Sequence, residues 1–160
     1  MIKSTLTVSA IIFFGLPALA VTVTGNADAI IKRALTATQN THINFGIIQA
    51  PTTGGTVTIS PAGVVSTAAT GFTFSGTPTA GNFTITGDAS TPLSVSFTNG
   101  TLSGPGTAMA IQNFTTTPAT GSITTNTSGS VSINVGADLI VGTNQTSGTY
   151  AGTYQLTVSY

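Results

Sequence analysis

Apolar and small polar residues alternate along most of the chain. Because successive side chains of a β-strand point to opposite faces, this period of two predicts strands with one buried face and one face in water. The clearest stretches carry Val, Ile, Leu, Phe or Tyr at one set of positions and Thr or Ser at the other, and they cover residues 56–59, 72–74, 83–86, 93–97, 131–135 and 154–160. Helical spacing is nearly absent, since only residues 28–35 fit two helical turns.

Turn-forming residues separate these stretches. Gly, Pro, Asn and Asp cluster at residues 51–55, 61–63, 76–78, 87–88, 99–100 and 104–106. Turn signals at a spacing of roughly 8 to 12 residues are typical of β-sandwiches and barrels. We therefore expect an all-β fold: one antiparallel β-sandwich of about nine to eleven short strands, immunoglobulin-like or Greek-key in topology.

The first 20 residues have the features of a secretory signal peptide. Lys3 supplies a positive start, residues 6–16 are mostly apolar, and residues 18–20 read Ala-Leu-Ala, which matches the small-residue pattern of a cleavage site. The apolar stretch is shorter than the roughly 20 residues that a membrane-spanning helix needs. We therefore predict a signal peptide over residues 1–20 and a single exported domain over residues 21–160, without a membrane span in the mature chain.

Charged residues are scarce. The sequence has three Lys or Arg residues, three Asp, one His and no Cys, so charged residues make up 4% of the chain, against about 25% in an ordinary domain. Three basic residues are too few to neutralise a nucleic-acid backbone, so we expect no nucleic-acid partner. The lack of Cys and the single His argue against zinc sites and thiol chemistry.

The polar residues form no recognisable catalytic constellation. The three carboxylates lie in separate turns, at Asp28, Asp88 and Asp138, and no Glu is present to pair with them. His42 is not accompanied by a nucleophile motif such as G-x-S-x-G. We therefore expect neither enzymatic activity nor a cofactor or metal. Asp88, which follows Gly87, has the placement of a structural turn residue, and Lys32 and Arg33 are interpreted as a solvated pair that guards a strand edge.

Both ends of the mature chain carry an apolar stripe. Val21, Val23, Ala27 and Ala29 alternate with polar residues, so residues 21–31 are predicted to be an extended amphipathic segment. This segment is either the first strand of its own sandwich or a strand added to the edge of a neighbouring subunit. At the other end, the stripe consists of Tyr154, Leu156, Val158 and Tyr160. These four residues predict a C-terminal strand that lies inside the fold or contacts a partner.

Several longer segments resemble a known family. They are residues 34–48, 55–63, 82–87, 135–142 and 148–160, of which Asn44-Phe45-Gly46 and residues 148–160 are the most specific. They resemble a family of secreted bacterial all-β proteins of unknown function, which is similar to the spore coat protein U-like subunits of archaic chaperone-usher pili. The resemblance implies an incomplete sandwich that lacks one strand, with the gap filled by the N-terminal segment of a neighbouring subunit.

The resemblance also implies roles for particular residues and partners. Val21, Val23, Ala27 and Ala29 would be donor-strand residues, and the groove would lie beside Tyr154, Leu156, Val158 and Tyr160. The expected partners are other copies or related pilus subunits, a periplasmic chaperone and an outer-membrane usher.

Two functions of different classes follow from these observations. The first is a structural subunit of an extracellular, fimbria-like filament, secreted through the periplasm to the cell surface and assembled by donor-strand complementation. The alternative is an autonomous secreted β-sandwich that binds carbohydrate or a host surface as an adhesin. Tyr150 and Tyr154, which flank Gly152, would then offer an aromatic surface to a sugar.

Overall fold

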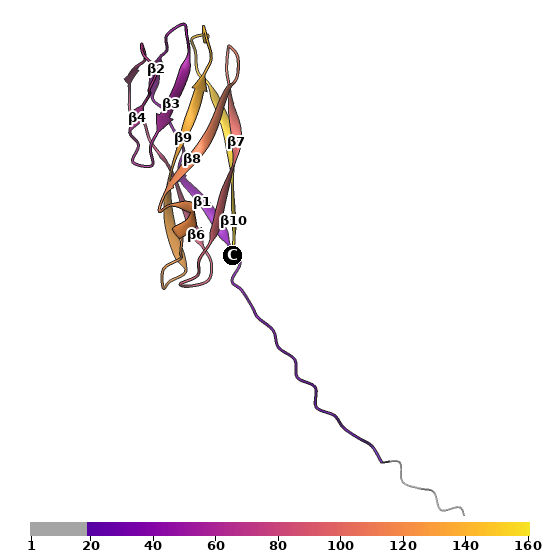
Figure 1. Ribbon diagram of the computed structural model, residues 1–160. Helices are drawn as coiled ribbons and strands as arrows, with labels where there is room; N and C mark the ends of the chain where they lie inside the picture. Colours follow the sequence, from indigo (N-terminus) through magenta and orange to yellow (C-terminus); the bar gives the residue numbers. More distant parts are fainter. Residues whose placement is uncertain (1–18) are drawn as a thin grey trace, which may run out of the picture. The chain divides into compact units, whose positions relative to one another are not determined.

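A computed structural model describes residues 19–160 of the chain (Figure 1). Most of the predicted signal peptide, residues 1–18, lies outside the described residues. Residues 31–160 form one compact unit. The described residues before it, 19–30, contain neither helix nor strand, and all their side chains are exposed.

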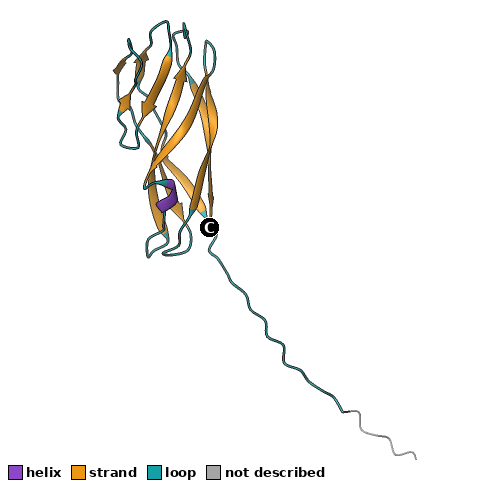
Figure 2. Cartoon of the chain, viewed as in Figure 1, coloured by secondary structure: helices purple, strands orange, loops and turns teal. Residues whose placement is uncertain are grey.

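The regular elements of the compact unit are β-strands and one 3-10 helix, joined by loops (Figure 2). The strands are β1 (Thr36–Thr41), β2 (Ile47–Gln49), β3 (Gly55–Ile59), β4 (Val65–Ser66), β5 (Thr73–Ser75), β6 (Gly81–Thr86), β7 (Ser94–Ser103), β8 (Met109–Thr117), β9 (Ser130–Val141) and β10 (Ala151–Ser159), and the 3-10 helix is η1 (Thr120–Ser122). The predicted all-β class is therefore confirmed. Within residues 19–160, no helix is long and apolar enough to cross a membrane.

The main sheet is antiparallel throughout and has the strand order β1-β6-β9-β8-β7-β10. The long strand β9 connects its two halves. Along one edge, the N-terminal part of β9 pairs with β6 and the C-terminal part pairs with β3, while its other edge pairs with β8. Gly136 lies where β9 passes from β6 to β3, and an added Cβ there would collide with the Ile59 carbonyl oxygen. A side chain at this position would therefore separate the strands.

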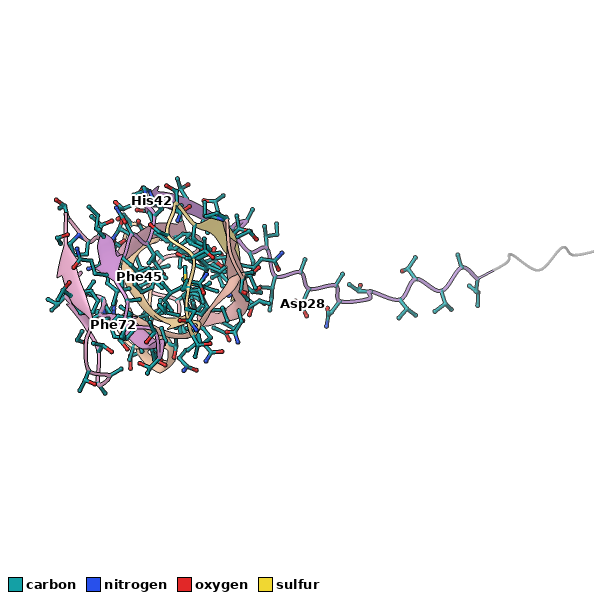
Figure 3. The ribbon with its side chains drawn as sticks, turned by 90° about the horizontal axis from the view of Figure 1, so that it is seen from above. Asp28, His42, Phe45 and Phe72 are labelled. Atoms are coloured by element: carbon teal, nitrogen blue, oxygen red, sulfur yellow. The ribbon has the colours of Figure 1, made fainter. Side chains whose placement is uncertain are left out.

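The core consists of two clusters of buried apolar side chains. The Phe45 cluster contains Phe45, Val57, Ile59, Met109, Ile111, Ala137, Leu139 and Val141. The Phe83 cluster contains Phe83, Ile85, Leu93, Val95, Ile123, Ile133 and Val135. Three side chains pack against both clusters, and these are Ile43, Phe114 and Tyr154. Figure 3 looks onto one end of the unit and shows the strands around this packed interior.

The alternation seen in the sequence corresponds to the two faces of the strands. In β6, Phe83 and Ile85 are buried, while the intervening Asn and Thr side chains face outward. These outward side chains bond to neighbouring strands: the hydroxyl groups of Thr36 and Thr86 lie 2.6 Å apart, and Asn82 donates to Ser132 at 3.0 Å. Threonine thus supplies a hydrogen-bonded outer face without charge.

Candidate functional site

The main sheet does not close, because its two terminal strands each have one free edge. β1 pairs only with β6, and β10 pairs only with β7, within the described part of the chain. Each free edge presents backbone N–H and C=O groups that no strand of residues 19–160 pairs. We refer to the gap between β10 on one side and β1 with its continuation, residues 42–50, on the other as the open seam.

A cavity of about 890 Å³ with an apolar floor lies at the open seam. Its walls come from both sides of the seam, including Gln39 and Ile43 on one side and Tyr150, Tyr154 and Leu156 on the other. Its floor is formed by core side chains from β8 and β9, namely Met109, Ile111, Leu139 and Val141. The cavity therefore reaches the hydrophobic core of the domain.

The turn Asn44-Phe45-Gly46 explains why β1 does not continue along the seam. Asn44 forms two backbone hydrogen bonds with Thr79, of 2.9 and 2.8 Å, and its side chain accepts the Gly46 N–H at 2.9 Å. Gly46 has a φ of 74°, a conformation that glycine adopts without strain. The turn places Phe45 in the core, whereas His42 remains on the outside (Figure 3). The chain then forms β2, which pairs with β5 instead of β10.

Tyr154 lines the cavity and carries a buried hydroxyl. Its ring lies among Phe83, Phe97 and Phe114, with centroid distances of 6.3, 6.3 and 4.8 Å. Its hydroxyl is buried and has no hydrogen-bond partner among the described residues. Burial raises the pKa of Tyr154 to about 12. A buried hydroxyl without a partner is costly, so this hydroxyl lowers the stability of the folded domain.

The predicted donor residues lie in the segment that forms no strand. Val21 and Val23 are 85% and 87% exposed, and Ala27 and Ala29 are also exposed. Polar residues separate these apolar side chains. The side chains of Val21, Val23, Ala27 and Ala29 thus form an exposed apolar stripe along the segment.

The predicted groove residues on β10 divide into two groups. Tyr154 and Leu156 line the cavity, whereas Val158 and Tyr160 do not. Val158 packs against the Phe83 cluster. Tyr160 follows the end of β10 and bonds instead to Arg33 and Asp88. The cavity floor from β8 and β9 was missed by the sequence reasoning, although the alternation at Met109 and Ile111 signals a buried strand face.

The remaining charged and aromatic candidates make contacts within the domain. Within residues 19–160, no three His, Cys, Asp or Glu side chains come together as metal ligands. Asp138 accepts hydrogen bonds from Thr58 and Asn113, at 2.6 and 3.0 Å. The Tyr150 and Tyr154 rings both pack against the Phe45 cluster, and the Tyr150 hydroxyl donates to the Thr146 carbonyl at 2.8 Å. Both residues also line the cavity at the open seam.

Comparison with known proteins identifies a family. A family model described as "Domain of unknown function (DUF4402)" matches residues 35–160, so the chain belongs to this family. The match begins one residue before β1 and includes the whole open seam, while residues 19–34 lie outside it. No curated protein and no solved structure matches the chain.

Proposed function

We propose that this DUF4402 protein is a structural subunit of an extracellular filament, in which the N-terminal segment of one subunit fills the open seam of the next. The observation that carries the proposal is the cavity of about 890 Å³ at the free edge of β10. A donated strand would pair its backbone with the free edges and place alternate side chains in the cavity. The subunit is secreted through the periplasm to the cell surface.

The N-terminal segment has the length and pattern that such an occupant needs. The ten residues 21–30 of the mature chain can reach about 34 Å when extended, which matches the length of about 30 Å of the nine-residue β10. Val21 and Val23 provide the larger apolar side chains, and Ala27 and Ala29 the smaller ones. Burying these side chains removes apolar surface from water in both the segment and the cavity.

The ends of β10 give the assembly a direction. The cavity is lined by the first part of β10, from Ala151 to Leu156. Arg33, where the chain enters the compact unit, is bonded to Tyr160 beyond the last residue of β10. A segment that leaves near one end of β10 and binds near the other end of a second copy makes a heterologous contact. Heterologous contacts extend into open chains unless their rotation closes a ring.

A subunit with an unfilled apolar seam requires protection before assembly, because large exposed apolar surfaces promote unspecific association. The resemblance of residues 34–48 and 148–160 to chaperone-usher pilus subunits suggests what provides it. We infer that a periplasmic chaperone covers the free edge of β10 and that an outer-membrane usher exchanges it for the segment of the next subunit. No enzymatic activity belongs to this function.

Assembly of the purified protein tests the proposal. The chain expressed without residues 1–20 is expected to form multimers that resist SDS, since strand-exchanged subunits share backbone hydrogen bonds and a common core. Deletion of residues 21–29 is expected to leave a folded monomer with an unchanged β-sheet circular dichroism spectrum. A full-length mature protein that stays strictly monomeric overturns the proposal. Glycan binding by such a monomer would favour the secreted binding module instead.

A further inference from the structure

The chain is held by a cluster of contacts where it enters the compact unit. The Arg33 N–H donates to Asp88 Oδ1 at 2.8 Å, and the Arg33 carbonyl accepts the Tyr160 hydroxyl. The same Tyr160 oxygen accepts the Asp88 N–H at 2.8 Å. The Lys32 ammonium group lies 3.5 Å from Asp88 Oδ2 and 5.1 Å from the centre of the Tyr160 ring. We call these four residues the tail-root clamp.

Gly87 packs closely against the Tyr160 side chain of the clamp. A Cβ added at Gly87 would lie 2.7 Å from the Tyr160 hydroxyl oxygen and 2.7 Å from Leu35 Cδ2. The clamp also gathers most of the charge in this part of the chain. Residues 19–160 contain five Asp, Lys or Arg residues, and three of them belong to the clamp; the five are Asp28, Lys32, Arg33, Asp88 and Asp138.

The ion pair contributes little to this arrangement. The Lys32 and Asp88 side chains are 53% and 27% exposed, and exposed pairs of this kind add little stability. The two bonds to the main chain of Arg33 are the specific part, because they fix both polar backbone groups of one residue. A fixed residue at this point determines where the N-terminal segment leaves the domain.

We propose that the tail-root clamp is a positioning device that presents the N-terminal segment to a neighbouring subunit and disfavours its insertion into the open seam of its own domain. This inference rests on the proposed function. The same segment that fits a neighbour's seam also has access to its own, since only residues 31–35 separate it from β1, and connections of this length are common in β-hairpins.

Without the clamp, insertion of the segment into the seam of its own domain would compete strongly with insertion into a neighbouring subunit. A segment tethered by a short connection acts at an effective concentration in the millimolar range, far above that of free subunits in dilute solution. To form a hairpin with the free edge of β1, the chain must reverse direction within residues 31–35. Arg33 lies in the middle of this connection, and the clamp occupies both of its backbone groups. Reversal therefore requires the bonds to Asp88 and Tyr160 to break.

A cysteine pair distinguishes the two outcomes, because the native sequence contains no Cys. Thr24→Cys lies on the polar face of the segment and Thr38→Cys lies on β1. Neither residue is one of the donor or cavity-lining residues. After treatment with a short bis-maleimide, a link within one chain runs as a monomer on a denaturing gel, whereas links between chains give a ladder. The doubly substituted mature protein is expected to give mainly a ladder.

Two clamp variants are then compared in this background. Tyr160→Phe removes the hydroxyl that bonds to the Arg33 carbonyl and to the Asp88 N–H, and Asp88→Ala removes the carboxylate that bonds to the Arg33 N–H. Each variant loses one hydrogen bond to Arg33, and each is expected to raise the fraction of internally linked monomer by about threefold to tenfold. Asp138→Asn is the matched control, because it removes a hydrogen-bonded carboxylate that has no contact with the clamp. It is expected to leave the ratio unchanged.

The possible results separate the two proposals. A ladder from the parent protein with the same monomer fraction in Tyr160→Phe and Asp88→Ala overturns the positioning role and leaves the proposed function standing. A parent protein that gives no ladder overturns the proposed function and the inference with it. If Asp88→Ala does not fold, Tyr160→Phe decides the question alone, because it keeps the ring and changes one exposed hydroxyl.

Discussion

The two core clusters differ in how completely strands cover them. Five of the eight buried members of the Phe45 cluster line the cavity, against one of the seven in the Phe83 cluster. At the Phe83 cluster, β1 runs along β6 and contributes Leu35 at its start. At the Phe45 cluster, the turn at Asn44 has already diverted the chain into the β2–β5 pair. The open half is thus the half along which β1 does not continue.

The largest expected effect comes from truncating the same residue type in the two clusters. Ile133 is fully buried in the Phe83 cluster, and Ile111 forms part of the cavity floor. In the monomer lacking residues 21–29, Ile133→Ala is expected to lower the free energy of unfolding by about 4 kcal/mol and Ile111→Ala by about 2 kcal/mol. The difference arises because Ile111 already borders empty volume and loses fewer contacts. Urea unfolding measures both free energies. Equal losses in the two variants would show that Ile111 is as tightly packed as Ile133 and does not border empty volume.

The second effect concerns the filling of the open half. Val21→Thr combined with Val23→Thr keeps the shape and β-branching of the segment but places two hydroxyls in the apolar cavity. At about 1–3 kcal/mol for each buried unpaired hydroxyl, subunit association is expected to weaken by more than tenfold. Thr22→Ser combined with Thr24→Ser alters the opposite face and serves as the control. Sedimentation velocity compares the two variants, and equal assembly by both would mean that this stripe is not the one buried.

The third effect concerns the closed half, where the chain is fixed at its entry. Gly87→Ala forces a Cβ against Tyr160 and Leu35, so it is expected to destabilise the domain by about 1–3 kcal/mol through overpacking. Gly121→Ala is the matched control, because a Cβ at Gly121 has no neighbour within 4 Å. Thermal unfolding followed by circular dichroism is expected to show a lower midpoint for Gly87→Ala alone. A Gly87→Ala protein as stable as the wild type would indicate that Tyr160 moves away without cost.

The fold class could be predicted from the sequence because most strands bury one face. Alternation in β6 and β9 follows directly from side chains such as Phe83 and Ile133, which enter the Phe83 cluster. β1 escaped recognition for the opposite reason. All its residues, from Thr36 to Thr41, are exposed, so no apolar stripe marks it as a strand. Its position depends on pairing with β6, which only the tertiary structure specifies.

The candidate site could be predicted only in part. The apolar stripe of the C-terminal strand indicated Tyr154 and Leu156, which line the cavity. Sequence periodicity predicts which face of a strand is buried, but not which part of the core each side chain contacts. The sequence therefore could not distinguish Tyr160, which lies away from the cavity, from Tyr154 and Leu156, which line it. The partners of Lys32 and Arg33 were equally hidden, since Asp88 lies more than 50 residues away along the chain. The sequence-based interpretation of Lys32 and Arg33 as a solvated pair at a strand edge did not include their contacts with Asp88.

The smallest effect concerns the hydroxyl of Tyr154, a residue that packs against both the Phe45 cluster and the Phe83 cluster. Burial raises the pKa of Tyr154 to about 12 in the folded protein, against about 10 in the unfolded chain. Between pH 10 and 12, the unfolded state therefore loses its proton first, and the free energy of unfolding falls as the pH rises. Below pH 10 both states keep the proton, so the titration of Tyr154 has no effect on the free energy of unfolding.

In the monomer lacking residues 21–29, Tyr154→Phe is expected to remove this part of the fall in stability at high pH. The free energy of unfolding at pH 7 is expected to be unchanged or slightly higher, since the hydroxyl has no hydrogen-bond partner to lose. Urea unfolding at pH 7 and at pH 11 provides the comparison, with Tyr150→Phe as the control. A clear loss of stability at pH 7 would show that a bound water molecule already satisfies the Tyr154 hydroxyl in the unfilled seam.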